Sequence, residues 1–305
     1  MEKKQWGGSW TEEKLVTFEK YVKAYLKIMN KNRNIYGWKL LYFDGFAGSG
    51  TRSSLDLAEE RRSVQDLFGE SISNEELNVY KGAAERIVSI EHDGIRSFDK
   101  YYFIDKNQEN CDALERKLSE YDVKGRKYFI HLDANEAIKR LANTLRVHRN
   151  VKTLLFLDPF GMQVNWNSVS QLRGLSIDLW ILVPTGVIVN RLLERKFDVT
   201  RGFSHAEKLE SFFGLNQEEI RKYFYTEKVE PSLFGDEETS VIKVENSIRK
   251  IAELYIDRLH TIFPFVSEEP LVLANNRNLP IYHLIFASQK KVAQKIAQQI
   301  IKSNE

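Results

Sequence analysis

The chain has 305 residues, 42% of them hydrophobic, so it can bury a core and is not expected to be disordered. Its net charge of +2 excludes the strongly basic composition of a dedicated nucleic-acid-binding domain, although a local basic face would suffice to bind RNA or DNA. Cys111 is the sole cysteine, which excludes an internal disulfide and a cysteine-based metal site. No apolar run is long enough to span a membrane, so we expect a cytoplasmic protein.

The first predicted element is a helix that follows an irregular arm at residues 1–10. Thr11 is a plausible N-cap, and apolar residues recur at helical spacing from Leu15 to Met29, so one face should be buried. The opposite face is rich in lysine. Such a face is usually a solvated surface, and contact with nucleic acid is the alternative.

A glycine-rich turn follows the first predicted strand. The apolar run 40–43 ends in Asp44, and Gly45, Phe46, Gly48 and Gly50 come next. Ligands of doubly wound sheets bind at this end of the first strand. The spacing is not that of a dinucleotide or triphosphate site, and an acid would repel phosphate but attract a cation or a hydroxyl donor. The turn therefore fits S-adenosylmethionine (SAM), and the alternative is an ordinary surface turn.

Four further strands alternate with helices beyond a polar insertion at residues 52–80. We expect strands at 101–105, 128–133, 153–158 and 177–184, with helices at 82–90, 108–121 and 135–147. Apolar strands separated by helices predict a mostly parallel sheet covered on both faces, an α/β fold of the Rossmann-like kind.

The C-terminal part begins with a polar stretch, 197–245, that we interpret as a small helical insertion. A helix at 246–263, an antiparallel hairpin at 271–274 and 281–287, and a last helix at 289–302 complete the prediction. The whole chain, 1–305, is expected to form a single domain with an N-terminal helical extension at 1–35.

Acids follow the first four strands, namely Asp44, Asp105, Asp133 and Asp158. Strand ends in such a sheet meet at one crevice, so these acids should converge. Asp105 suits a ribose diol, although it lies 60 residues after Gly45 rather than at the usual spacing of about 20. Asp133 could contact the edge of an adenine, or it could simply cap the next helix.

The best catalytic candidate is the turn Asp158, Pro159 and Phe160. Methyl transfer to an amine depends on position more than on a strong base, and a carboxylate can hold the N–H. Phe160 could stack a planar base, which would have to be flipped out of a helix, and Pro159 would fix the turn. The alternative is a rigid turn without chemistry. No two of the six histidines have the spacing of a metal site, so we predict none.

The chain resembles the three-Cys-motif partner protein (TcmP) family. The segments that carry the resemblance are Trp10-Thr11 with Lys14-Leu15, Tyr42 to Gly50, Tyr102 to Lys106, Asp133 to Glu136, and Phe156 to Gly161 with Val164 and Trp166. The resemblance implies a class I SAM-dependent methyltransferase fold, a seven-stranded, mostly parallel sheet that ends in an antiparallel hairpin.

By motif, the resemblance implies SAM contacts at Asp44, Gly45, Phe46 and Gly48, a ribose contact at Asp105, an adenine-edge contact at Asp133 and a substrate-side turn at 158–160. It also implies a partner protein with three clustered cysteines. This chain has a single proline, Pro159, where the amino-methyltransferase signature has two.

These observations predict a SAM-dependent methyltransferase-like protein that acts on an amino group of a nucleic-acid base, in RNA or DNA. The alternative is a SAM- or nucleotide-binding subunit without catalysis that serves a three-cysteine-motif partner. A metal-dependent nuclease-like protein is the third hypothesis.

Overall fold

The computed structural model describes residues 9–50, 82–195, 197–198, 201–231, 237–275 and 277–303. The expected arm up to residue 8 and the expected insertion at 52–80 lie outside these ranges. None of the described helices is both long and apolar enough to cross a membrane.

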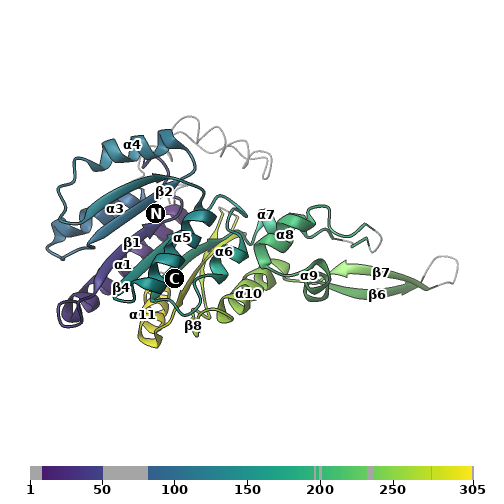
Figure 1. Ribbon diagram of the computed structural model, residues 1–305. Helices are drawn as coiled ribbons and strands as arrows, with labels where there is room; N and C mark the ends of the chain where they lie inside the picture. Colours follow the sequence, from purple (N-terminus) through teal and green to yellow (C-terminus); the bar gives the residue numbers. More distant parts are fainter. Residues whose placement is uncertain are drawn as a thin grey trace, which may run out of the picture.

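The molecule is a mixed α/β fold around a mostly parallel central sheet, as predicted (Figure 1). The parallel strands are, in spatial order, β3 (Arg126–His131), β2 (Lys100–Asp105), β1 (Lys39–Asp44), β4 (Val151–Leu157) and β5 (Ile177–Val183). β10 (Pro280–Ser288) pairs antiparallel with β5, and on its other side with β8 (Phe265–Val266) and β9 (Leu271–Ala274). The sheet has eight strands, and our expectation of seven is wrong because β8 and β9 share the position beside β10.

Helices cover both faces of this sheet. One face packs against α1 (Ser9–Asn32), α3 (Ala83–Ser89), α4 (Gln108–Leu118) and α11 (Lys291–Lys302). The other packs against α5 (Ala134–Val147), α6 (Trp166–Ser170) and α10 (Ser247–His260). A short 3₁₀ turn, η2 (Ile90–Asp93), follows α3. Two separate apolar clusters, one per face, hold these layers together.

Helix α1 is part of the core. It begins at Ser9, so Thr11 lies inside its first turn and is not the N-cap that we predicted. Phe18 stacks on Phe156 of β4 with ring centroids 4.1 Å apart. The hydroxyl of Tyr21 donates to the partly buried carboxylate of Asp178 at 2.7 Å, which fixes the helix over β5. The N-terminal helix therefore packs directly on the central strands, and its first turn lies near their carboxyl ends.

The region predicted as a helical insertion also contains strands. After α7 (Val187–Leu192) come α8 (Ala206–Phe213) and α9 (Gln217–Phe224). A hairpin of β6 (Tyr225–Pro231) and β7 (Glu237–Lys243) then extends away from the central sheet (Figure 1). The sequences of these strands are rich in polar residues and lack the regular apolar alternation that predicts a strand.

Candidate functional site

The carboxyl edge of the central sheet brings the four strand-end acids together. Asp44 ends β1 between two neighbours, level with Phe103 of β2 and Phe156 of β4. Asp105 and Asp158 each lie two residues further along those neighbouring strands. Since adjacent strands are about 4.8 Å apart, their acids share one edge. Asp133 lies two residues beyond the end of β3 at the same edge.

Asp44 is a buried acid, only 1% exposed. One carboxylate oxygen accepts from the Phe46 N–H at 3.1 Å, and the other accepts from the Tyr42 hydroxyl at 3.2 Å. Burial raises the pKa of Asp44 to about 7, and the negative charge of Asp158 adds to the rise, whereas both hydrogen bonds and Lys14 oppose it. The charge of the Asp44 carboxyl group near neutral pH therefore depends on the charges of the groups that lie next to it.

Lys14 forms a buried ion pair with Asp158. Its Nζ lies 2.5 Å from Oδ2 of Asp158, and the side chains are 5% and 18% exposed. The same Nζ lies 5.6 Å from the ring centre of Trp10, which stacks on Tyr282 of β10 at 5.6 Å. The second turn of α1 thus places a cation beside both Asp44 and Asp158, and no local sequence pattern indicated this role.

The turn after β4 presents an aromatic ring to solvent. Phe160 is 61% exposed, whereas Pro159 is buried. The backbone N–H of Phe160 donates to Oε1 of Gln163 at 3.1 Å, and the Gln163 carbonyl accepts from Asn135 at 2.9 Å. The first turn of α5 therefore holds this loop in place, so that the exposed ring sits on a fixed backbone.

The glycine turn is tied to the strands on both sides. The Gly45 N–H donates to the Phe156 carbonyl at 2.9 Å, and a Cβ there would lie 2.5 Å from a methyl group of Leu157. Gly48 has a φ of +63° with nothing within 4 Å of a Cβ position, so it faces open space. Gly50 also has a positive φ, and its carbonyl accepts from Lys117 at 2.6 Å.

Asp105 organises the loops beside it. One oxygen accepts from the Gly48 N–H at 3.1 Å, and the other accepts from the Asn107 N–H at 2.7 Å and from the Asn110 side chain at 3.1 Å. A carboxylate offers about four acceptor positions, so little capacity remains for a diol. Asp133 caps α5 through one oxygen, which accepts from Asn135 and Glu136, as the capping interpretation predicted.

A buried histidine lies at the same edge, on β10. His283 Nδ1 is 2.6 Å from the Thr185 hydroxyl, two residues beyond the end of β5. Burial lowers the pKa of His283 to about 4, so the ring is neutral at physiological pH. No local sequence pattern singles out this pair, because its members are 98 residues apart.

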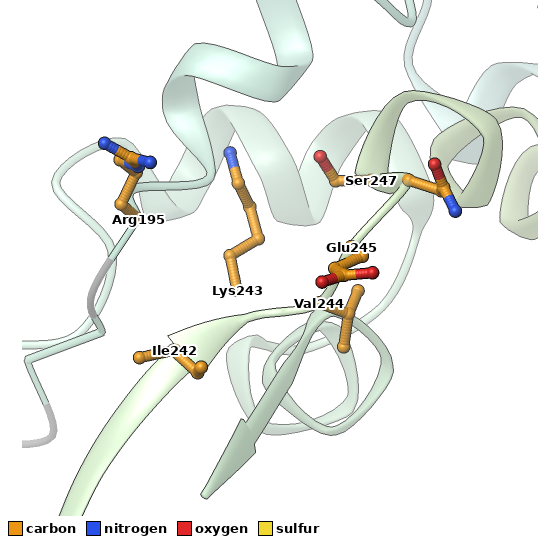
Figure 2. Close-up of a pocket in the computed structure, with 7 residues that line it drawn as sticks. Arg195, Ile242, Lys243, Val244, Glu245 and Ser247 are labelled. Carbon is orange, nitrogen blue, oxygen red and sulfur yellow. The ribbon is translucent and has the colours of Figure 1, made fainter. Parts of the chain in front are cut away.

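A surface pocket of about 500 Å³ lies elsewhere, between the base of the β6–β7 hairpin and the start of α10. Arg195, Lys243 and Ser247 are among the residues that line it (Figure 2). Lys243 donates to the carbonyls of Asn190 and Leu193 at 2.9 and 2.7 Å, so it holds the end of α7. This pocket contains none of the predicted site residues.

The parts of the chain that the structure describes contain no group of three or more His, Cys, Asp or Glu side chains that could hold a metal ion. Comparison with known proteins finds no family that matches the sequence and no curated protein that matches it. Any functional assignment therefore depends on the geometry of the carboxyl edge itself.

Proposed function

We propose that this chain is a SAM-dependent methyltransferase-like protein that acts on an amino group of a nucleic-acid base. The observation that carries the proposal is the convergence of Asp44, Lys14 and Asp158 beside the glycine turn. The strand order, five parallel strands followed by the antiparallel β10, supports it by its resemblance to class I methyltransferases.

The residues present fit a cationic ligand that carries hydroxyl groups. Asp44 lies at the end of β1, and its raised pKa means that a nearby cation would favour its charged form. Gly48 leaves open space where any other residue would place a Cβ. Asp105 retains one free acceptor position by our count, enough for one ribose hydroxyl. SAM, when bound, would supply a methyl group activated by a sulfonium.

On the acceptor side, Asp158 would position the nucleophile. Lys14 binds its Oδ2, and no hydrogen bond to Oδ1 is found among the described residues. That oxygen can accept an N–H from an amino group, which orients the nitrogen lone pair without requiring a strong base. The exposed ring of Phe160 would stack against the planar base, which must be flipped out of any duplex to reach it.

A second candidate function is a SAM- or nucleotide-binding subunit without catalysis that serves a three-cysteine-motif partner. The observation in its favour is that Lys14 already binds the carboxylate of Asp158, as expected of an ion pair with a structural role. The nuclease-like hypothesis has less support, because the described acids form no cluster with the ligand number of a metal site.

The test is calorimetric titration of the purified chain with SAM, with Asp105→Ala and Asp44→Asn as variants. We expect micromolar binding, about −8 kcal/mol, and weaker binding by both variants. Because the cation of SAM would favour ionised Asp44, binding at pH 7 should release a proton, and the heat should depend on the ionisation enthalpy of the buffer. Asp44→Asn should abolish that dependence. No binding by the wild-type chain would refute the proposal for the isolated protein.

Transfer of a labelled methyl group to RNA and DNA then separates the two candidates. The enzyme hypothesis requires transfer by the wild-type chain and its loss in Asp158→Asn with SAM binding retained. If SAM binds and no nucleic acid is methylated in the presence or absence of a cysteine-rich partner, the subunit hypothesis is preferred.

A further inference from the structure

The opposite edge of the sheet carries an exposed group of cations around two aromatic rings. We call it the amino-edge patch, because it lies where β1 and β4 begin and where β10 ends. Its members are Tyr36, Trp38, Lys39, Arg149, Lys152 and Lys290. β1 is six residues long, so the patch lies roughly 20 Å from the strand-end acids and is separate from the candidate site.

The aromatic part of the patch is held rigidly. Tyr36 is 61% exposed and stacks on Trp38 with ring centroids 4.9 Å apart. Buried Arg33 anchors the loop through an ion pair with Asp99 at 2.5 Å. The Trp38 N–H also donates to the Arg33 carbonyl at 2.9 Å. An exposed ring on a fixed backbone can stack a ligand at little entropic cost.

The cations of the patch are not neutralised from within. Among the residues that the structure describes, Lys39, Arg149 and Lys290 form no ion pair, and all three are exposed. Lys152 lies 5.4 Å from the Trp38 ring centre. Burial lowers the pKa of Lys152, and the like charge of Lys290 lowers it further. The charges of Lys152 and Lys290 repel one another, so an anionic partner would relieve the repulsion.

Two acids at this edge of the sheet are already engaged by other groups of the protein. Asp99 binds Arg33 and accepts from the Leu40 N–H at 2.7 Å. The carboxylate of Asp178 accepts hydrogen bonds from the hydroxyls of Tyr21 and Ser288. The patch therefore presents positive charge and a π-face to solvent, and these two carboxylates are not free to pair with it.

We infer that the amino-edge patch binds single-stranded nucleic acid. Phosphates would pair with Lys39, Arg149 and Lys290, and a base would stack on Tyr36. A groove or surface that combines cations with aromatic rings is the usual means of binding single strands without sequence preference. An acidic polypeptide would satisfy the charges but would leave the exposed ring without a partner. The inference goes beyond the proposed function, since it requires neither SAM nor catalysis.

The experiment measures fluorescence anisotropy of a labelled, mixed-sequence single strand of about 20 nucleotides with the full chain. The test variant is Arg149→Glu with Lys290→Glu, and the matched control is Lys139→Glu with Lys208→Glu. Both pairs change the net charge from +2 to −2, and neither control residue lies at this edge. We expect the test pair to weaken binding about tenfold or more and to reduce the salt-dependence slope by about 1.4. The control pair should do neither.

Tyr36→Ala isolates stacking from charge. It should weaken binding about tenfold with an unchanged salt slope, and its exposed position means that folding should be retained. The inference is overturned if the wild-type chain does not bind the strand, or if both charge pairs weaken binding equally. It is also overturned if polyglutamate competes as well as the strand while Tyr36→Ala binds normally. Calorimetry with SAM on the same variants should be unchanged, so that failure here is distinct from failure of the proposed function.

Discussion

The two edges of the central sheet differ in how far their charged side chains are buried and paired. At the carboxyl edge, Asp44 is buried, Asp158 is paired with Lys14, and Asp105 accepts three N–H donors. At the amino edge, the exposed bases Lys39 and Arg149 have no ion-pair partner in the described part of the chain.

The difference shows which charges contribute to folding stability and which are available to bind partners. Charges that are buried and paired are coupled to folding, so changes at the carboxyl edge should alter stability and its pH dependence. Exposed, unpaired charges contribute little to stability, so changes at the amino edge should affect only the binding of partners.

The pH dependence of stability should distinguish the carboxyl edge most strongly. The folded-state pKa of Asp44 is raised from 3.8 to about 7, so between these values the folded state holds a proton that the unfolded state has lost. This group therefore makes stability fall as pH rises, by about 1.4 kcal/mol per pH unit. In urea titrations, Asp44→Asn should gain stability relative to wild type from pH 4 to pH 7 and no more above it. A difference that stays constant with pH would contradict the assignment.

The contribution of His283 to stability should depend on pH in the opposite direction. Its folded-state pKa is lowered from 6.5 to about 4, so its contribution is fully present above pH 6.5 and is lost as pH falls toward 4. His283→Gln should therefore lose less stability than wild type on acidification through that window. The two groups partly cancel in the wild-type chain, so each variant should have a steeper pH profile than the parent, in opposite directions. Parallel profiles would rule out this compensation.

Breaking the Lys14 ion pair should have the next largest effect. Lys14→Met is of similar length but leaves Asp158 without its partner, at a cost of about 2 kcal/mol because Asp158 is partly exposed. Lys39→Met at the amino edge is the matched control and should change stability by less than about 0.5 kcal/mol. Adding Asp158→Asn to Lys14→Met should recover much of the loss. Equal costs for the two lysines would show that the edges do not differ.

Each edge of the sheet also has a glycine in the left-handed backbone conformation. Gly48 at the carboxyl edge and Gly37 at the amino edge both have a φ of +63° and open space at the Cβ position. Replacing either glycine by alanine should therefore lower stability by about 1 kcal/mol, because alanine is strained in the left-handed backbone conformation. Only Gly48→Ala should weaken SAM binding in calorimetry, because only Gly48 lies in the proposed ligand site. An equal loss of binding in Gly37→Ala would point to a general effect on folding.

Part of this site could be predicted from the sequence and part could not. Asp44, Asp105 and Asp158 were found because an acid at the end of an apolar strand is a local pattern, and parallel strands carry such ends to one edge. Lys14 was missed as a site residue because it contacts Asp158 across 144 positions, and a lysine near the start of a helix has no distinguishing local signal. The same holds for Thr185 with His283.

The smallest effect on stability is expected at Phe160, where the two edges are most alike. Like Tyr36, Phe160 is 61% exposed, so Phe160→Ala should change the free energy of unfolding by less than about 0.5 kcal/mol. If it stacks the acceptor base, the same substitution should reduce methyl transfer about tenfold while SAM binding is unchanged, and Phe160→Tyr should restore most of the transfer. Tyr36→Ala should instead weaken the binding of the strand and leave transfer to a short substrate intact. If both substitutions affected transfer equally, the two rings would belong to one continuous site.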